Sequence, residues 1–171
     1  MIYAIDPGST ESAWVLLDQG VPVDHGKGEN DAVLECLHIA FNPASPLAIE
    51  GIASYGMAVG KEVFDTCIWI GRFWEAWAAR GGNVHLIYRR EVKLFHCETS
   101  RANDANVRAA LIDRYGPGKG KAVGTKGAPG PLYGIKGDEW SALAVALTAE
   151  GKPAPAAIFR EAAPALEAKP F

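Results

Sequence analysis

The sequence has only three cysteines, Cys36, Cys67 and Cys97, which lie far apart and form no CxxC pair. This spacing argues against a disulfide framework and against a zinc site, and it predicts reduced, mostly packed thiols. No apolar run is long enough to span a bilayer. The first residues include no basic stretch, and Asp6 interrupts their short apolar run, which argues against a signal peptide. We therefore expect a cytoplasmic protein with no membrane partner.

The overall amino-acid composition is ordinary for a globular domain. Of the 171 residues, 49% are apolar and 22% are charged, which is enough apolar material for one sizeable core. We expect one domain over residues 1–150. Residues 151–171 hold seven alanines and four prolines, and this composition predicts a poorly ordered, flexible tail.

The charges are unevenly distributed along the chain, although the net charge is only −3. Residues 84–136 carry ten Lys and Arg against four Asp and Glu, whereas the segments on either side are acidic. A basic section of this kind can form a face that follows a row of phosphates. It can equally be a solvated surface with a local excess of charge.

The hydrophobic pattern predicts an α/β protein in which strands and helices alternate. Residues 116–137 are rich in Gly, Pro and Lys and have almost no periodicity, so we expect a mobile loop there. The helix expected from about 61 to 80 is apolar on more than one face, which fits either burial between layers or a subunit contact. The expected strands are 2–6, 12–18, about 21–25, 47–50 and 84–88, and the expected helices are about 30–41, 61–80, 90–96, 103–115 and 138–149.

Acidic residues stand at comparable places in this pattern. Asp6 ends the first strand, Glu50 ends the fourth, and Asp138 and Glu139 open the last helix. Strand ends of a mixed sheet converge at one edge, so we expect these carboxylates to meet there. Oxygen ligands suit Mg²⁺ or Mn²⁺, and two such ions can activate water for phosphodiester cleavage. Taken singly, each acid can instead start a turn, lie in solvent or complement a helix dipole.

Four segments together resemble the RuvC-type Holliday-junction resolvases, and the closest resemblance is to their phage-encoded branch. The segments are YAIDPGS (3–9), AIE (48–50), REVK (90–93) and DEWSALA (138–144). The resemblance covers residues 1–149. It implies an RNase H-like fold with a mixed five-stranded sheet flanked by helices. It further implies a homodimer that cuts four-way DNA junctions with two Mg²⁺ or Mn²⁺ ions per active site, in the host cytoplasm if a phage encodes it.

The resemblance also implies roles for single residues. Asp6 would bridge both metal ions, Glu50 would be the second ligand, and Asp138 matches the first acid of the final helix. Ser141 stands where the family usually has an aspartate, so it can hold a metal-bound water but supplies no charge. Glu139 can replace the missing acid, although it points about 100° away on an ideal helix.

Basic residues in the middle of the chain are the candidates for DNA contact. Lys93 matches a family residue near the scissile phosphate, where it can stabilise developing charge; otherwise it is a surface lysine. Tyr55 can stack on an unpaired base or be an ordinary core or surface aromatic. The segment 119–134 lacks the GxxxxGK[ST] order, so we expect no nucleotide cofactor. The candidate DNA-binding residues are Arg89, Arg90, Lys93, Arg101, Arg108, Lys119, Lys121, Lys126 and Tyr55.

Two other interpretations of the same residues stay open. One is an RNase H-like nuclease that acts on other branched DNA or on RNA. The other is a catalytically weak nucleic-acid-binding module, which the serine at position 141 favours. Actin-like ATPases and sugar kinases share the Asp-x-Gly turn, but they need a second large lobe that 171 residues cannot supply.

Overall fold

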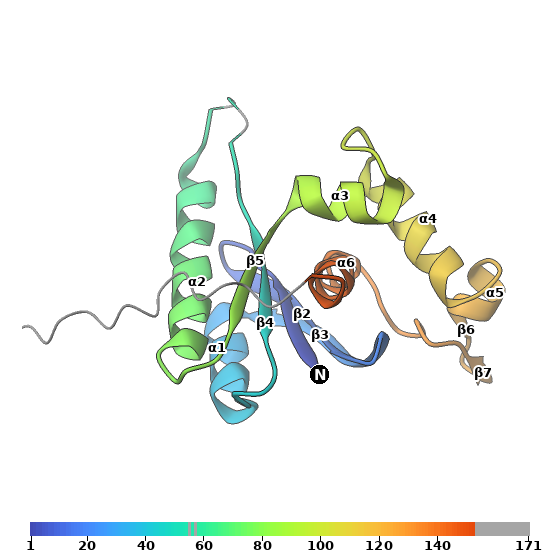
Figure 1. The fold of residues 1–171 in the computed structure, drawn as a ribbon, viewed down its shortest axis with the longest axis horizontal. Helices are drawn as coiled ribbons and strands as arrows, with labels where there is room; N and C mark the ends of the chain where they lie inside the picture. The colour runs from blue at the N-terminus through green and yellow to red at the C-terminus, as the bar shows by residue number, and fades with distance from the viewer. Residues whose placement is uncertain (55, 57, 153–171) are drawn as a thin grey trace, which may run out of the picture.

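The computed structural model describes residues 1–54, 56 and 58–152 (Figure 1). Within these residues a central sheet has five strands in the order β3-β2-β1-β4-β5. The first three strands pair antiparallel, whereas β1–β4 and β4–β5 pair in parallel. The sheet is mixed and flanked by helices, which confirms the predicted α/β fold. The strands are β1 (Ile2–Asp6), β2 (Glu11–Asp18), β3 (Val21–Glu29), β4 (Leu47–Gly51) and β5 (Val84–Tyr88).

Helices cover both faces of this sheet (Figure 1). On one face lie α1 (Asn30–Ile39) and α2 (Lys61–Ala78), which contact each other. On the other face α6 (Glu139–Glu150) lies against β1 and β2. Further out on that side are α3 (Arg89–Cys97), α4 (Asp104–Tyr115) and α5 (Lys119–Ala122).

Side-chain alternation along the strands divides the core into two parts, because successive residues of a strand point to opposite faces. Ala4 of β1 and Ala48 of β4 pack on the α6 side. Their neighbours Ile5 and Ile49 pack on the α1–α2 side, around the fully buried Trp77. Consequently the next residue after each isoleucine points to the α6 side.

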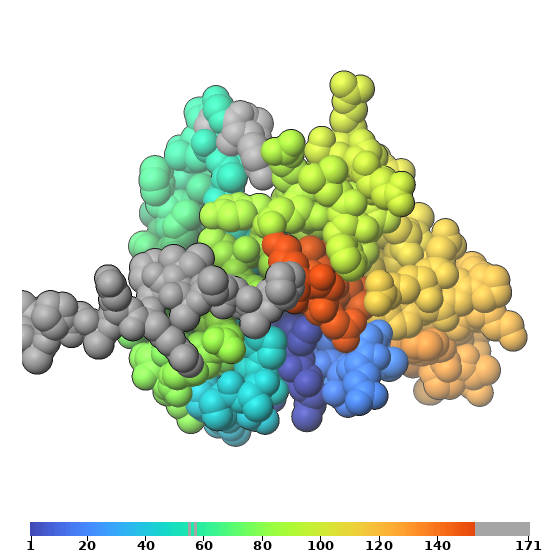
Figure 2. Space-filling view, viewed as in Figure 1, coloured from blue at the N-terminus to red at the C-terminus, as the bar shows by residue number. Residues whose placement is uncertain are grey.

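Helix α6 is the most deeply buried helix of the described part of the chain. Ten of its twelve residues are buried, and most of these are alanine, leucine or valine. Small side chains let a helix approach a sheet closely, and alanine and leucine also favour the helix itself. Figure 2 accordingly shows only a small part of α6 (red) at this surface, between α3 (green) and the first strands (blue).

The segment 116–137, where we expected a mobile loop, contains regular structure, and one strand is longer than predicted. The segment contains α5 and a two-stranded hairpin of β6 (Gly124–Thr125) and β7 (Ala128–Pro129). Ala122 and Leu132 in this segment are completely buried in the core. Such short elements leave no periodic signal. Strand β3 runs four residues beyond the expected end because it pairs with β2 along its whole length, up to Glu11 opposite Glu29.

The thiols also differ from the prediction. Cys36 and Cys67 are exposed, on α1 and α2, and only Cys97 is half-buried. All three are free, as expected. No helix among the described residues is long and apolar enough to cross a membrane. Tyr55 and residues 153–171, which include nearly all of the predicted tail, lie outside the described residues.

Candidate active site

Asp6 and Glu50 stand side by side at the ends of two neighbouring parallel strands. Ile5 of β1 is in register with Ile49 of β4, so the residues that follow are also adjacent. Both isoleucines pack on the α1–α2 side, and therefore both carboxyl groups point toward α6. The two carboxyl groups are close enough for each to affect the pKa of the other.

This pairing changes the acidity of both groups. Burial, followed by the nearby Glu50 carboxylate and its hydrogen bond and then by Asp138, raises the pKa of Asp6 to about 8. Burial also raises the pKa of Glu50, although the adjacent Arg89 guanidinium opposes that shift. Because like charges in a partly buried site cannot both ionise easily, the raised pKa keeps Asp6 largely protonated near neutral pH when no metal ion is bound.

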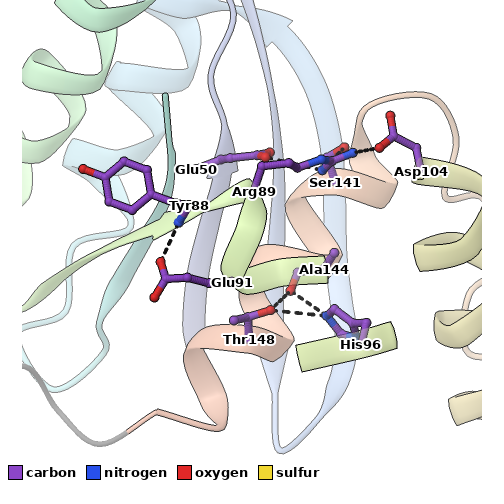
Figure 3. Close-up of polar contacts among 9 residues, drawn as sticks. All are labelled: Glu50, Tyr88, Arg89, Glu91, His96, Asp104, Ser141, Ala144 and Thr148. Atoms are coloured by element: carbon purple, nitrogen blue, oxygen red, sulfur yellow. Dashed lines mark hydrogen bonds and ion pairs between the residues drawn. The ribbon is translucent and has the colours of Figure 1, made fainter. Parts of the chain in front are cut away.

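Arg89, the first residue of α3, places its guanidinium between Glu50 and Ser141 of α6 (Figure 3). Its Nη1 lies 3.3 Å from Glu50 Oε1 and 3.4 Å from Ser141 Oγ. Its Nη2 forms an ion pair with Asp104 at the start of α4. One cationic side chain thus contacts groups from β4, α4 and α6.

Asp138, immediately before α6, is the third acid of the site. Its carboxylate lies 2.9 Å from Lys27 Nζ on β3, and Lys27 is also 3.5 Å from Glu11. Asp138 is nevertheless near enough to raise the pKa of Asp6. In the part of the chain that the structure describes, no three or more His, Cys, Asp or Glu side chains are grouped closely enough to hold a metal ion as they stand.

Glu139 occupies a different position from the one that the sequence suggested. It is buried, its Oε2 lies 2.9 Å from His25 Nδ1, and it accepts the backbone N–H of Lys136 at 3.0 Å. This carboxylate therefore ties the start of α6 to β3. The structure brings Glu139 to His25 and not to the Asp6–Glu50 pair, because the first turn of α6 directs it away from Ser141, so we do not retain Glu139 among the proposed ligands.

Two residues near the site, Lys27 and His25, were not identified as candidates from the sequence. Lys27 was missed because β3 was expected to end at about residue 25. His25 was not among the candidate site residues. The signal that could have found both is the two-residue period of a strand, which places positions 25 and 27 on the same face.

The candidate DNA-binding residues are spread over the α6 side of the molecule. Arg90, Arg101 and Arg108 are exposed on or next to α3 and α4, and Lys93 on α3 is half-buried. The Arg108 guanidinium lies over the Trp140 ring, 4.5 Å from its centre. Lys119, Lys121 and Lys126 are exposed on α5 and at the β6–β7 turn, at the far end of this side (Figure 1).

A cavity of about 360 Å³ opens beside the acids, between α4 and the start of α6. Arg108 and Trp140 form one part of its wall, and Trp140 Nε1 is buried without a hydrogen-bond partner among the described residues. The polar lining continues directly into the site through Arg89, Asp104, Asp138 and Ser141. The cavity is therefore an extension of the candidate active site.

No protein-family model and no curated protein matches the sequence. The fold is similar to that of Thermus thermophilus RuvC, with a TM-score of 0.59 and 19% identity over 86% of this chain and 91% of that chain. It is also similar to T. thermophilus RuvC in complex with a Holliday junction substrate, with a TM-score of 0.58 and 18% identity over 86% and 90% of the two chains. Membership of the phage-encoded branch stays a prediction. The chain therefore has a RuvC-like fold, which is the RNase H-like architecture that the sequence predicted.

Proposed function

We propose that this protein is a metal-dependent endonuclease that hydrolyses phosphodiesters at four-way DNA junctions. The observation that carries the proposal is the juxtaposition of Asp6 and Glu50 at the ends of neighbouring parallel strands, beside Asp138 and Ser141 at the start of α6. The RuvC-like fold supports it, since a solved RuvC structure holds a Holliday junction substrate. Paired carboxylates at strand ends, together with a basic outer surface, suit the hydrolysis of a polyanion.

The donor set fits a hard divalent cation. Burial makes both carboxyl groups reluctant to ionise, and at Asp6 the nearby Glu50 carboxylate adds to this effect. A cation can take the place of the proton on Asp6. Mg²⁺ or Mn²⁺ would be held by Asp6 and Glu50, with Asp138 contributing from the start of α6. When bound, the metal supplies an activated water and stabilises negative charge on the phosphate.

The other residues position DNA and control charge around this pair. Arg89 lies against Glu50 and limits the repulsion between the two carboxylates. Lys93 and the exposed arginines of α3 and α4 offer cations to backbone phosphates, which gives affinity without sequence readout. Glu139 and His25 hold the start of α6, and hence Asp138, against β3.

A cleavage panel tests the substrate class. With Mg²⁺ or Mn²⁺, a synthetic four-way junction should be cut at symmetric positions, and faster than a flap, a Y-fork, a duplex, a single strand or an RNA–DNA hybrid. Equal or faster cleavage of another substrate would favour the alternative of a broader RNase H-like nuclease. Tight junction binding without cleavage of any substrate would favour the binding module.

We propose further that the protein acts as a homodimer, because two coordinated cuts need two active sites. Phe64 and Ile68 are large apolar side chains on α2 with exposures of 59% and 62%. They are four residues apart and share one face of the helix, whereas Phe73 and Trp77 point into the core. A second copy of the chain, packing through the same face, would cover both residues.

Replacing Phe64 and Ile68 together with Glu should convert the dimer to a monomer, because both charges would be buried at the contact. Light scattering after size exclusion measures the mass. Val23→Glu is the matched control, since Val23 is equally apolar and 56% exposed, but lies on β3. A dimer that survives the double substitution, or a parent protein that is already monomeric at micromolar concentration, would contradict the proposed contact.

A further inference from the structure

Arg89 is an unusual group to find among candidate metal ligands, because it is a permanent cation. Its Nη1 is shared between Glu50 Oε1 and Ser141 Oγ, at 3.3 and 3.4 Å. Both side chains were named above as candidate metal ligands, Glu50 from β4 and Ser141 from α6. The guanidinium therefore stands where two ligands from different elements converge (Figure 3).

The base of this side chain is fixed on both sides. The Glu91 carboxylate accepts the N–H of Tyr88 at 2.8 Å, which caps the first turn of α3. Near the other end of α3, His96 Nε2 donates to the carbonyl oxygen of Ala144 at 3.0 Å, which joins α3 to α6. Arg89 thus starts from a helix that is anchored to the same helix that carries Ser141.

The tip of the side chain is fixed as well. Asp104 pairs with Nη2, while Nη1 faces Glu50 and Ser141. Arg89 is half-buried, with 25% of its side chain exposed. Contacts at both Nη atoms already restrict the guanidinium, so keeping it in this position costs little additional conformational entropy. A solvated surface lysine would lose more.

The charges of the site favour one divalent ion over two. Three carboxylates, those of Asp6, Glu50 and Asp138, are candidate ligands, and Asp138 is already 2.9 Å from Lys27. A further carboxylate, that of Asp104, is paired with Arg89. A second divalent ion would add two positive charges next to the guanidinium. On the α6 side its ligand would be the Ser141 hydroxyl, which carries no negative charge. Repulsion between cations a few Å apart is strong in a partly buried site.

We propose that Arg89 is a built-in cation that takes the place of a second metal ion, so that each site binds a single divalent ion. This inference rests on the proposed function, which requires one metal at the Asp6–Glu50 pair. It also revises the expectation of two ions per site. It explains why a serine can stand at position 141, where the resemblance leads one to expect an aspartate. A hydroxyl suffices there because its partner is an arginine and not a metal ion.

Mn²⁺ binding to the intact protein tests the inference without any DNA. Titration calorimetry gives the stoichiometry, and electron paramagnetic resonance reports whether two Mn²⁺ ions are close enough to couple, at about 3.5–4 Å. For the parent protein we expect one Mn²⁺ per chain and an uncoupled spectrum. Two ions per chain with a coupled spectrum would overturn the inference.

A double variant provides the converse test. Arg89→Gln removes the cation and Ser141→Asp supplies a further carboxylate, so together they should raise the stoichiometry to two and produce the coupled spectrum. Arg90→Gln is the matched control, because Arg90 is the exposed neighbour on the same helix, and it should leave one ion bound. A double variant that still folds, as judged by its thermal transition, and still binds a single ion would count against the inference.

Asp6→Asn separates this inference from the proposed function. If the parent binds no Mn²⁺, or binds it equally well after Asp6→Asn, the metal site itself is wrong and the proposed function fails with it. If the parent binds two ions and Asp6→Asn removes both, the proposed function stands and only the role of Arg89 is wrong. The parent measurement alone can decide the matter, even if the double variant does not fold.

Discussion

Asp6→Asn should reduce cleavage of a four-way junction by about 10³-fold or more, which corresponds to about 4 kcal/mol of activation free energy. The change removes the central carboxylate of the Asp6–Glu50 pair but keeps its shape, and an amide can still hydrogen-bond to Glu50. Junction binding should change by no more than a few-fold, because the exposed basic residues of α3 and α4 are untouched. Single-turnover cleavage and a gel-shift titration in EDTA measure the two effects separately.

Asp113→Asn is the appropriate control for this experiment. Asp113 is an exposed carboxylate on α4, so its replacement makes the same chemical change at a position outside the candidate site. We expect it to retain parental cleavage. A purified Asp6→Asn protein that cleaves junctions at the parental rate would falsify the proposed role of the pair.

The affinity for Mn²⁺ or Mg²⁺ should fall about tenfold for each pH unit below about 8, since binding must displace the proton that Asp6 holds. Above that pH the affinity should level off. Calorimetric titrations at about pH 6, 7 and 9 measure the trend, and repeating them in buffers with different ionisation enthalpies counts the released protons. Cleavage at a low, fixed Mg²⁺ concentration should follow the same curve. A pH-independent affinity over this range would show that Asp6 is already ionised.

The raised pKa of Asp6 also predicts how the stability of the metal-free protein depends on pH. A carboxyl group whose pKa is higher in the folded state favours folding when it is protonated. The contribution of Asp6 to the free energy of unfolding is therefore greatest below about pH 4, the pKa of an aspartate in the unfolded chain. It declines as the pH rises to about 8 and is constant above that pH. Asp6→Asn should remove this decline and raise the metal-free Tm at alkaline pH by several degrees. A lower Tm for the variant at alkaline pH would contradict it.

The pairing of Asp6 and Glu50 could be predicted from the sequence because each acid directly follows a short apolar run. Such runs identify buried strands, and the order of the elements implies that their ends converge. The placement of Ala4 and Ala48 on one face, with Ile5 and Ile49 on the other, follows from the strand period alone. For the same reason the overall α/β architecture could be predicted without knowledge of any contact.

The contacts of Arg89 and Glu139 could not be predicted in this way. Arg89 was expected to bind DNA phosphates, but its partners come from β4, α4 and α6, which are distant in sequence. Glu139 depends on His25, which is 114 positions earlier. Long side chains find partners through tertiary packing, and neither periodicity nor propensity encodes that. The structure of residues 116–137 could not be predicted for a related reason. Single buried residues such as Leu132 hold this segment in place, and they form no periodic hydrophobic pattern.

The order of the elements along the chain also determines when the acids can meet during biosynthesis. Asp6 lies on β1, which is synthesised before the other strands of this sheet, whereas Asp138 and Ser141 lie at the start of α6, the last helix of the described residues. Because α6 packs directly against β1 and β2, an unfinished polypeptide lacks both the helix that closes the core and half of the polar groups. Hydrolytic competence would then arise only after synthesis has passed α6, so nascent chains would pose no hazard to DNA nearby.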